Sequence, residues 1–218
     1  FGKGSKICNI HFCNLPRKFS TEIACGKKSA ALTSTTIYKA VNKYLSNQCT
    51  EYGPMKYWNT SNVTNMNGLF ANLAYYKGLK SHDKQEPYLT AVHNFNEDIS
   101  EWNTTKVTDL SNMFCSSENL FAKNFNQPID TWNVSKATNM REMFQNAPIF
   151  NQDISGWNVS NVTNMEQMFA NAISFNQYLS NWNTSKVNNY NLFGYDTPIC
   201  NKSYCNLPRN FGINQACD

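Results

Sequence analysis

Long apolar runs are missing from this chain of 218 residues. No stretch of about 18 consecutive apolar residues occurs, so the sequence predicts no membrane span. No signal peptide precedes Phe1, and we expect a mature product or an excised piece. Charge is also scarce, because charged residues make up 16% of the chain and the formal net charge is +4. Such a mild charge predicts no nucleic-acid partner.

Catalytic and metal-binding patterns are missing as well. The histidines, His11, His82 and His93, lack the spacing to Cys, Asp or Glu that is typical of a zinc site. No nucleophile elbow, phosphate-binding glycine loop or calcium loop occurs. His82 and Asp83 are adjacent, but such neighbours on a loop are more typical of solvated side chains. We therefore expect no enzyme, no cofactor and no metal site.

Tryptophan begins a repeated motif through the middle of the chain. Its five copies, WNTSNVTNMNGLF, WNTTKVTDLSNMF, WNVSKATNMREMF, WNVSNVTNMEQMF and WNTSKVNNYNLF, start at Trp58, Trp102, Trp132, Trp157 and Trp182. The last two intervals are both 25 residues. A fixed period of about 20 to 50 residues is typical of a solenoid, in which each unit buries its apolar face against its neighbours.

A single unit indicates the local structure. Residues 162–165 predict a short parallel strand because Val and Thr favour the pleat, and residues 166–171 predict a short helical turn. The apolar positions that return in the other units predict an inward wall, and they are Ile154, Trp157, Val162, Met165, Met168, Phe169, Ala172 and Phe175. The expected fold class is therefore a repeat solenoid of short parallel strands and short helical turns.

The repeated elements FNQ, WN[VT]S, NVTNM and MF resemble those of BspA-like leucine-rich-repeat surface proteins, over roughly Ile37 to Gly194. The resemblance implies a leucine-rich-repeat-like solenoid that serves adhesion or assembly outside the cell, without catalysis. One departure is the residue after tryptophan, which is commonly Asp in that family and is Asn in all five units here.

Two columns of asparagine follow the repeat. The first comes after phenylalanine, at Asn96, Asn126, Asn151 and Asn176, and we expect it to satisfy backbone groups at a tight corner. The second comes after tryptophan and begins an Asn-x-Ser/Thr acceptor sequence in each unit. The predicted N-glycosylation sites are Asn59, Asn62, Asn103, Asn133, Asn158, Asn161, Asn183 and Asn201. The alternative for the second column is a hydrogen-bonded amide ladder under the Trp ring, and the sequence does not separate the two.

Eight cysteines indicate an oxidising compartment and the secretory route. Cys8, Cys13 and Cys25 recur as Cys200, Cys205 and Cys217 at an offset of 192 residues, and thirteen of the first twenty-six residues match their counterparts. We predict a disulfide-rich knot at each end, with Cys49 as a further partner in the first and the connectivity open. The match favours a tandem module over homologous caps on one protein. Cys115 is predicted to be a buried free thiol.

The expected domain order is a knot over 1–32, a capping helix over 33–50, a five-coil solenoid over 51–194 and a second knot over 195–218. The helix prediction rests on the amphipathic spacing of Ile37, Ala40, Val41, Tyr44 and Leu45. An insertion near residues 75–92 interrupts the solenoid. Its candidate partner-binding residues are Tyr75, Tyr76, His82 and Tyr88, with simple surface elaboration as the alternative.

The expected function is a secreted or cell-surface, N-glycosylated structural module that assembles with itself, head to tail or in tandem, into a fibre or surface layer. Residues 1–50 carry a formal charge of +7 and the remainder −3, a difference that would steer such contacts. The alternative is an adhesin or receptor module that binds a host protein or glycan through the solenoid face or the 75–92 insertion.

Overall fold

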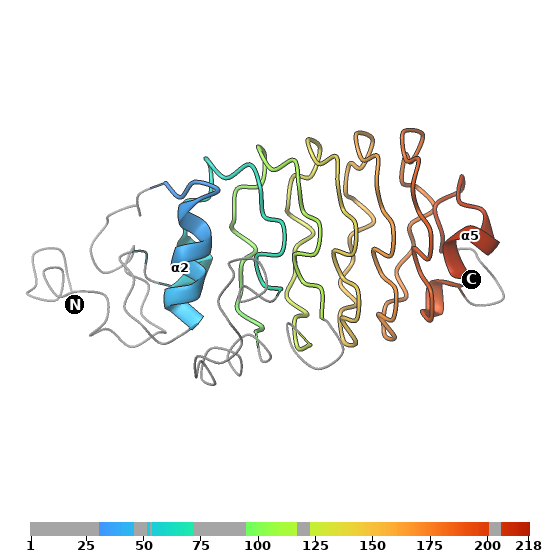
Figure 1. Cartoon of the computed structure of the whole chain (residues 1–218), viewed down its shortest axis with the longest axis horizontal. Helices are drawn as coiled ribbons and strands as arrows, with labels where there is room; N and C mark the ends of the chain where they lie inside the picture. The colour runs from blue at the N-terminus through green and yellow to red at the C-terminus, as the bar shows by residue number, and fades with distance from the viewer. Residues whose placement is uncertain (1–30, 46–51, 53, 72–94, 117–122, 201–205) are drawn as a thin grey trace, which may run out of the picture.

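Stacked coils form the body of the molecule. Figure 1 shows a computed structural model of the chain, which describes residues 31–45, 52, 54–71, 95–116, 123–200 and 206–218. The coils lie side by side along the long axis, and each contains one of the five tryptophans. Each coil is named here by its tryptophan, from the Trp58 coil to the Trp182 coil.

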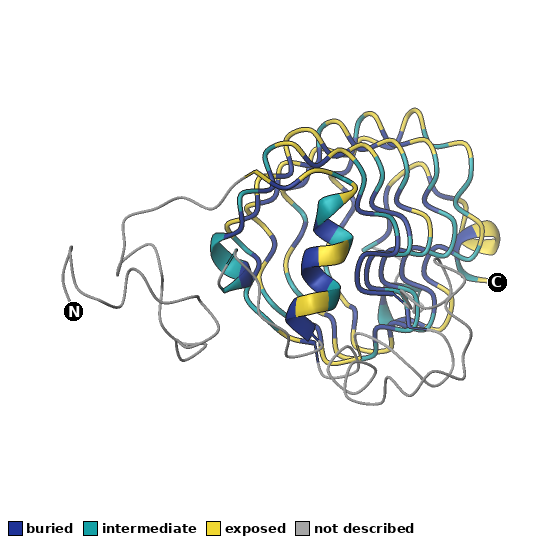
Figure 2. Cartoon of the chain, turned by 60° about the vertical axis from the view of Figure 1, so that its left-hand side comes forward, coloured by how far each residue is buried: buried dark blue, intermediate teal, exposed yellow. Residues whose placement is uncertain are grey.

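Helix α2, Thr36–Leu45, covers the N-terminal end of the stack (Figure 1). Its apolar face buries Ile37, Ala40, Val41, Tyr44 and Leu45, while its opposite face is exposed (Figure 2). The segment before α2 closes the edge of the first coil, because the Ser34 hydroxyl accepts the Thr64 N–H at 2.9 Å. The other described helices are short: η3, Met55–Tyr57, η4, Pro198–Cys200, and α5, Ile213–Cys217.

Two columns of phenylalanine form the centre of the core. Phe70, Phe114, Phe144 and Phe169 stack with ring centroids 5.4 to 5.6 Å apart. Phe95, Phe125, Phe150 and Phe175 form the second column at 5.7 to 6.1 Å. Each ring of one column also lies 3.9 to 4.0 Å from its partner in the other. Burying these rings stabilises the stack by about 1.5 to 3 kcal/mol for each phenylalanine.

The C-terminal end of the aromatic stack is closed by a change of ring orientation. Phe193 meets Phe169 edge-on at 5.2 Å, and Phe211 meets Phe193 edge-on at 4.9 Å. Backbone bonds from Leu192 to Gln215 and from Gly194 to Ala216, both 2.8 Å, hold α5 against the last coil. The column that runs from Phe70 to Phe169 is therefore capped by Phe193 and Phe211.

The tryptophans tie each coil to the coil before it. The indole Nε1 of Trp132 donates to the carbonyl of Ile99 at 3.2 Å, and that of Trp157 donates to Ile129 at 3.1 Å. Trp102 and Trp182 bond in the same way to Met55 and Ile154. A buried indole N–H needs such an acceptor, so the tryptophan also fixes how neighbouring coils align.

The predicted fold class, a leucine-rich-repeat-like solenoid with short parallel strands and helical turns, was wrong. The described residues contain no strand longer than an isolated bridge and no sheet; parallel bridges join single residues such as Asn139 and Asn164. Residues 166–171 form turns and not a helix.

The predicted strand over 162–165 is reduced to a single bridge at Asn164, and the predicted helical turn over 166–171 is replaced by turns. Glu142 and Asn146 have positive φ values of 56° and 55°, and Gln167 and Asn171 repeat them at 54° and 60°. Left-handed residues at these positions interrupt the right-handed backbone that a helical turn needs. The coils still pair, because alternate N–H groups such as those of Met140 and Glu142 donate to Asn164 and Glu166 of the next coil, both at 2.9 Å.

The prediction of disulfide-rich knots at both ends was also wrong for the part of the chain that the structure describes. One disulfide is present there, between Cys200 and Cys217. It links α5 to η4, and its two cysteines are 17 residues apart in the sequence. The other predicted disulfide cysteines lie outside the described residues, and they are Cys8, Cys13, Cys25, Cys49 and Cys205.

Candidate functional site

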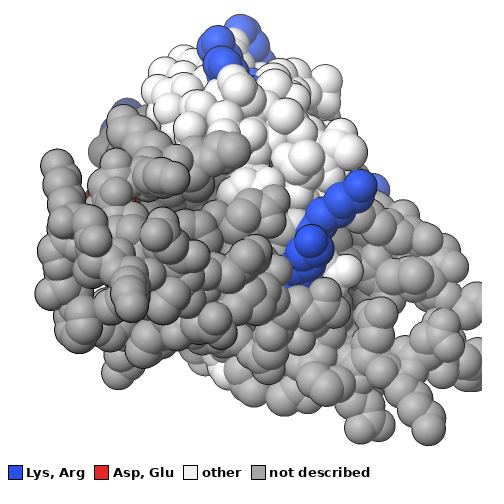
Figure 3. Space-filling model, turned by 90° about the vertical axis from the view of Figure 1, so that its left-hand side faces the viewer, with Lys and Arg blue, Asp and Glu red and all other residues white. Residues whose placement is uncertain are grey.

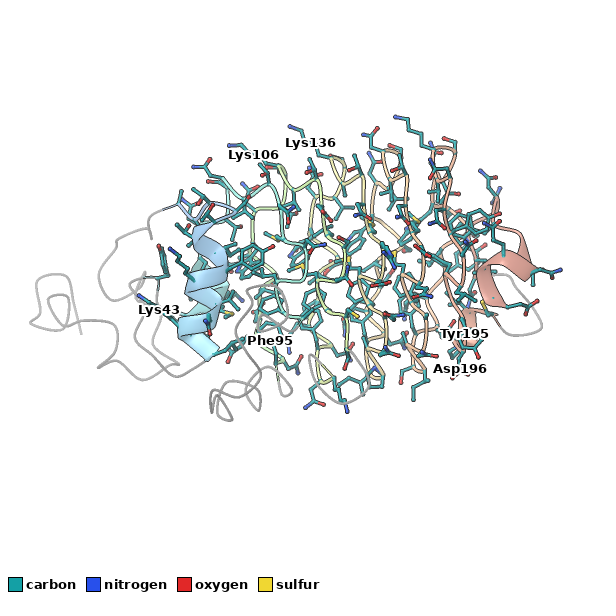
Figure 4. The ribbon with its side chains drawn as sticks, in the orientation of Figure 1. Lys43, Phe95, Lys106, Lys136, Tyr195 and Asp196 are labelled. Atoms are coloured by element: carbon teal, nitrogen blue, oxygen red, sulfur yellow. A yellow bond between two sulfur atoms is a disulfide. The ribbon has the colours of Figure 1, made fainter. Side chains whose placement is uncertain are left out.

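The asparagine after each tryptophan occupies one edge of the stack. We call these residues the Trp-Asn row, and they are Asn59, Asn103, Asn133, Asn158 and Asn183. Each uses its side-chain Oδ1 to accept the backbone N–H two residues later, at 3.0 to 3.2 Å. Figure 4 marks this edge by Lys106 and Lys136, which follow two members of the row by three residues.

The hydroxyl of the acceptor sequence folds back onto the same oxygen. Thr105, Ser135 and Ser160 donate to the Oδ1 of Asn103, Asn133 and Asn158 at 2.6 to 2.7 Å. These local turns are typical of asparagine and hold its amide in one orientation.

The amide nitrogens of four members of this row are open. Asn103, Asn133, Asn158 and Asn183 are exposed, and their Nδ2 atoms have no hydrogen-bond partner among the described residues. Asn59 is half-buried and makes a further interaction, so it differs from the other four. The row therefore forms no ladder from coil to coil.

The amide ladder belongs to the other asparagine column. The backbone N–H of Asn126 donates to Asn96 Oδ1 at 2.9 Å, that of Asn151 donates to Asn126 Oδ1 at 3.0 Å, and that of Asn176 donates to Asn151 Oδ1 at 2.9 Å. Asn206 continues the ladder through its Nδ2, which donates to Asn176 Oδ1 at 2.9 Å. This column holds the phenylalanine corners of the coils together.

The two remaining acceptor asparagines in the described residues have different surroundings. Asn161 is held at both ends of its amide, because its Nδ2 donates to the Ser135 carbonyl at 2.9 Å and its Oδ1 accepts from Lys186 at 2.6 Å. Asn62 is exposed and its Oδ1 accepts from Lys106 at 2.9 Å. The hydroxyls of their acceptor sequences, on Thr163 and Thr64, bond to other coils or segments and not to the asparagine.

A cleft of about 450 Å³ lies beside the disulfide at the C-terminal end, where Figure 4 labels Tyr195 and Asp196. Its walls combine the Cys200–Cys217 pair with Ile173, Pro198 and two carboxylates, those of Asp196 and Asp218. Ile173 and Tyr195 are large apolar residues left exposed at this end. Sequence reasoning missed this cleft because it depends on how α5 folds back onto the last coil.

Cys115 is a free thiol, as predicted, but it is half-buried and not fully buried. Burial raises its pKa to about 12, and its Sγ lies 3.4 Å from Gln145 Oε1. At neutral pH almost no thiolate forms, so a nucleophilic role is unsupported.

A few charged groups in the described coils form ion pairs. Lys56 and Asp98 form an ion pair at 2.6 Å, and Arg141 bridges to Glu166 at 3.1 Å. Burial by itself raises the pKa of Asp98, but hydrogen bonds from Lys56 and Ser100 outweigh it and leave the pKa below its ordinary value. At the N-terminal end, Figure 3 shows basic side chains on the described surface.

Within the described ranges, no group of three or more His, Cys, Asp or Glu side chains is placed to hold a metal ion. None of the helices described there is long and apolar enough to cross a membrane. The candidate partner-binding residues Tyr75, Tyr76, His82 and Tyr88 lie outside the described residues, as do Asn201 and the other histidines.

A further polar column went unnoticed in the sequence. Asn65, Asp109, Asn139, Asn164 and Asn189 form the parallel bridges from coil to coil. Each also accepts the backbone N–H two residues later, as Asn164 Oδ1 does from Glu166 at 3.0 Å. The recurring Asn or Asp before Met or Leu in NVTNM and KVTDL was the signal for it.

The repeated coils of this chain match a known protein family. The family described as "Mycoplasma protein of unknown function, DUF285" matches residues 39–120 and again residues 86–205, and the second match alone spans more than half of the chain. The chain belongs to this family. Together, the two DUF285 matches begin in α2, run through all five tryptophan coils and end a few residues after η4. No curated protein and no solved structure matches the chain.

Proposed function

We propose that the chain is a structural module of a secreted or cell-surface protein, in which the stacked coils serve as a stiff spacer. The observation that carries this proposal is the continuity of the side-chain columns. The tryptophan bonds, the two phenylalanine stacks and the asparagine ladder run through successive coils with one set of contacts at each step. Repeat proteins of this kind gain stability from contacts between neighbours, and their length scales with the number of repeats.

The surface location is supported by the sequence. The repeats resemble those of BspA-like surface proteins, and the DUF285 family is a repeat family that agrees with this resemblance in a loose sense. The Cys200–Cys217 disulfide fits an oxidising compartment.

Assembly in tandem or head to tail completes the proposal, and it rests on the two end segments that match at thirteen of twenty-six positions at an offset of 192 residues. Helix α2 covers the first coil, and Phe211 covers the last phenylalanine. Successive modules would therefore join through their end segments, because α2 and α5 lie at the two ends of the described coils.

Removing one whole coil tests the spacer function. Deletion of residues 151–175 joins Phe150 to Asn176 and so keeps the Phe-Asn corner in register. We expect assemblies of the native full-length protein to keep forming, with a repeat shorter by about 4.8 Å for each module. The exposed substitution Asp130→Asn is the matched control and should leave the repeat unchanged. A native protein that stays monomeric at high concentration would contradict the proposal.

An adhesin is the second candidate, and the exposed apolar side chains beside the C-terminal cleft favour it. Ile173 is 57% exposed and Tyr195 45% exposed, although both follow buried core positions. Exposed apolar groups next to a cleft are typical of contact surfaces. Capture of a host protein or glycan that is lost in Ile173→Ser, with assembly unchanged, would favour this function over the spacer.

A further inference from the structure

We infer that Asn103, Asn133, Asn158 and Asn183 are the principal N-glycan acceptors of the described coils, and that Asn161 is a poor acceptor although it has the same type of acceptor sequence. The inference rests on the proposed secreted or surface location, because N-glycans are added along the secretory route. It assigns a chemical role to one edge of the stack.

The chemistry of attachment sets what the fold must leave free. The new bond joins the side-chain Nδ2 of asparagine to C1 of the first sugar, while the bond from C1 to a phosphate oxygen of an activated glycosyl-phosphate donor breaks. The phosphate leaves with the electron pair, and the proton lost from Nδ2 passes to a base of the transferase. The product is a bulky group on Nδ2, and the folded chain must accommodate it.

The four chosen residues meet this requirement in the same way. Their Oδ1 atoms are used within their own turns, at 3.0 to 3.2 Å from the backbone N–H two residues later. Their Nδ2 atoms have no partner in the described part of the chain, and all four side chains are exposed. A sugar on Nδ2 would therefore break no hydrogen bond and displace no packed group.

Asn161 is also exposed, but its amide nitrogen is not free. Its Nδ2 is held against the Ser135 carbonyl of the preceding coil at 2.9 Å, and its Oδ1 is held by Lys186 of the following coil at 2.6 Å. The amide thus lies between two coils, and a sugar on it would compete with contacts on both sides. Asn62 is intermediate, because Lys106 holds its Oδ1 at 2.9 Å but no described residue holds its Nδ2.

The fold brings acceptors that are far apart in the sequence into one row along the stack. Asn133 and Asn158 are 25 residues apart in sequence, yet neighbouring coils pair at a spacing of about 4.8 Å. Glycans on neighbouring coils must fan outward, so we expect partial occupancy at each member. Sugars would cover this edge and leave the cleft beside the disulfide, which has no described acceptor among its lining residues, free for protein contacts.

Asn158 and Asn161 provide the sharpest comparison, since they are three residues apart and are each followed by valine. Native full-length protein is treated with a glycan-releasing amidase in ¹⁸O water, which converts each glycosylated asparagine into labelled aspartate. We expect label on the four row residues and at least tenfold less on Asn161 than on Asn158. Equal label on Asn158 and Asn161, or more on Asn161, overturns the inference.

Variants that remove one acceptor sequence give an independent readout. Ser160→Ala abolishes the Asn158 acceptor but keeps the backbone bond of its turn, so we expect the loss of one glycan from the intact mass. Ser160→Thr should keep that glycan and reports on folding. Thr163→Ala removes the Asn161 acceptor and should leave the mass distribution of glycans unchanged; a loss of glycan mass here contradicts the inference.

The outcome also separates this inference from the proposed function. An unlabelled protein that is accessible to a surface-labelling reagent on intact cells overturns the glycan row and leaves the structural module in place. An unlabelled protein found inside the cell overturns both.

Discussion

Replacing Thr184 by valine should stabilise the protein, whereas the same replacement at Thr104 should destabilise it. The two threonines stand at the same position of their coils, two residues after tryptophan. Thr104 Oγ1 donates to the Asn133 carbonyl of the next coil at 3.0 Å, and Thr60 Oγ1 donates in the same way to Asn103. Thr184 is 3% exposed, and its Oγ1 has no hydrogen-bond partner among the described residues.

The magnitudes follow from the cost of an unsatisfied hydroxyl. A buried polar group without a partner costs about 1 to 3 kcal/mol, and a satisfied hydrogen bond contributes about 1 kcal/mol net. Valine replaces the hydroxyl by a methyl group of similar size, and the chain itself places Val134 and Val159 at this position in its middle coils. We therefore expect the free energy of unfolding to rise by about 1 kcal/mol in Thr184→Val and to fall by about 1 kcal/mol in Thr104→Val.

Urea denaturation of both variants checks the sign. The midpoint should shift up for Thr184→Val and down for Thr104→Val, with the slope of the transition unchanged in both. Ser180 has a second buried hydroxyl that lacks a partner in the part of the chain that the structure describes, so Ser180→Ala should also shift the midpoint upward. If Thr184→Val lowers the midpoint as far as Thr104→Val does, the last coil satisfies that hydroxyl and the reasoning fails.

Three further predictions concern single residues. Gly68 has φ 60°, so Gly68→Ala should lower the free energy of unfolding by about 1 kcal/mol. Gly156→Ala is the control, because an added Cβ there meets nothing within 4 Å, and it should be neutral or slightly stabilising. Thermal unfolding of the two variants checks this difference. Cys115, with its pKa raised to about 12 by burial, should resist alkylation at pH 8 in the folded protein and react once urea unfolds it, so rapid labelling of the native state would be the contrary result. Hydrogen bonds from Ser155 lower the pKa of Asp153, and Lys56 and Ser100 lower the pKa of Asp98 in the same way. The two carboxylates should therefore stabilise the fold fully above about pH 4, and this stabilisation should be lost as the pH falls through their lowered pKa values. Asp98→Asn and Asp153→Asn should flatten this acid dependence in a pH series of unfolding midpoints.

The sequence allowed the inward positions of each coil to be predicted. Ile154, Trp157, Val162, Met165 and Phe169 are all buried, because an apolar residue that recurs at a fixed period must face the contact between neighbours. The amphipathic spacing in the segment of α2 also matches its buried face.

The backbone between those positions could not be predicted in the same way. The β propensity of valine and threonine favours a strand over Val162 to Met165, but only an isolated bridge at Asn164 forms there. Residues 166–171 form turns in place of the predicted helical turn, because Gln167 and Asn171 adopt positive φ. Asparagine tolerates that conformation, whereas glutamine gives no hint of it. These turns are therefore set by the pairing of coils and not by local preference.

The asparagine column after phenylalanine was predicted to satisfy backbone groups, and it does so, but the role of the column after tryptophan could not be decided from the sequence. Asn151 and Asn158 are both exposed, and both belong to a repeating column. What separates them is the partner of Oδ1, which is the N–H of Asn176 on the next coil for Asn151 and the N–H of Ser160 in the same turn for Asn158. Only the three-dimensional register distinguishes a ladder from a row of local turns.

The central claim is that coils about 25 residues apart stack in one register, and a cysteine-pair experiment tests it most directly. Thr138 and Thr163 are exposed neighbours on adjacent coils, since the Thr163 N–H donates to the Thr138 carbonyl at 2.8 Å. In a Cys115→Ser background, we predict that Thr138→Cys with Thr163→Cys forms a disulfide on mild oxidation, while Thr108→Cys with Thr163→Cys, two coils apart, stays reduced. A bond that forms as readily in the distant pair, or a neighbouring pair that stays reduced, would contradict the stacked arrangement.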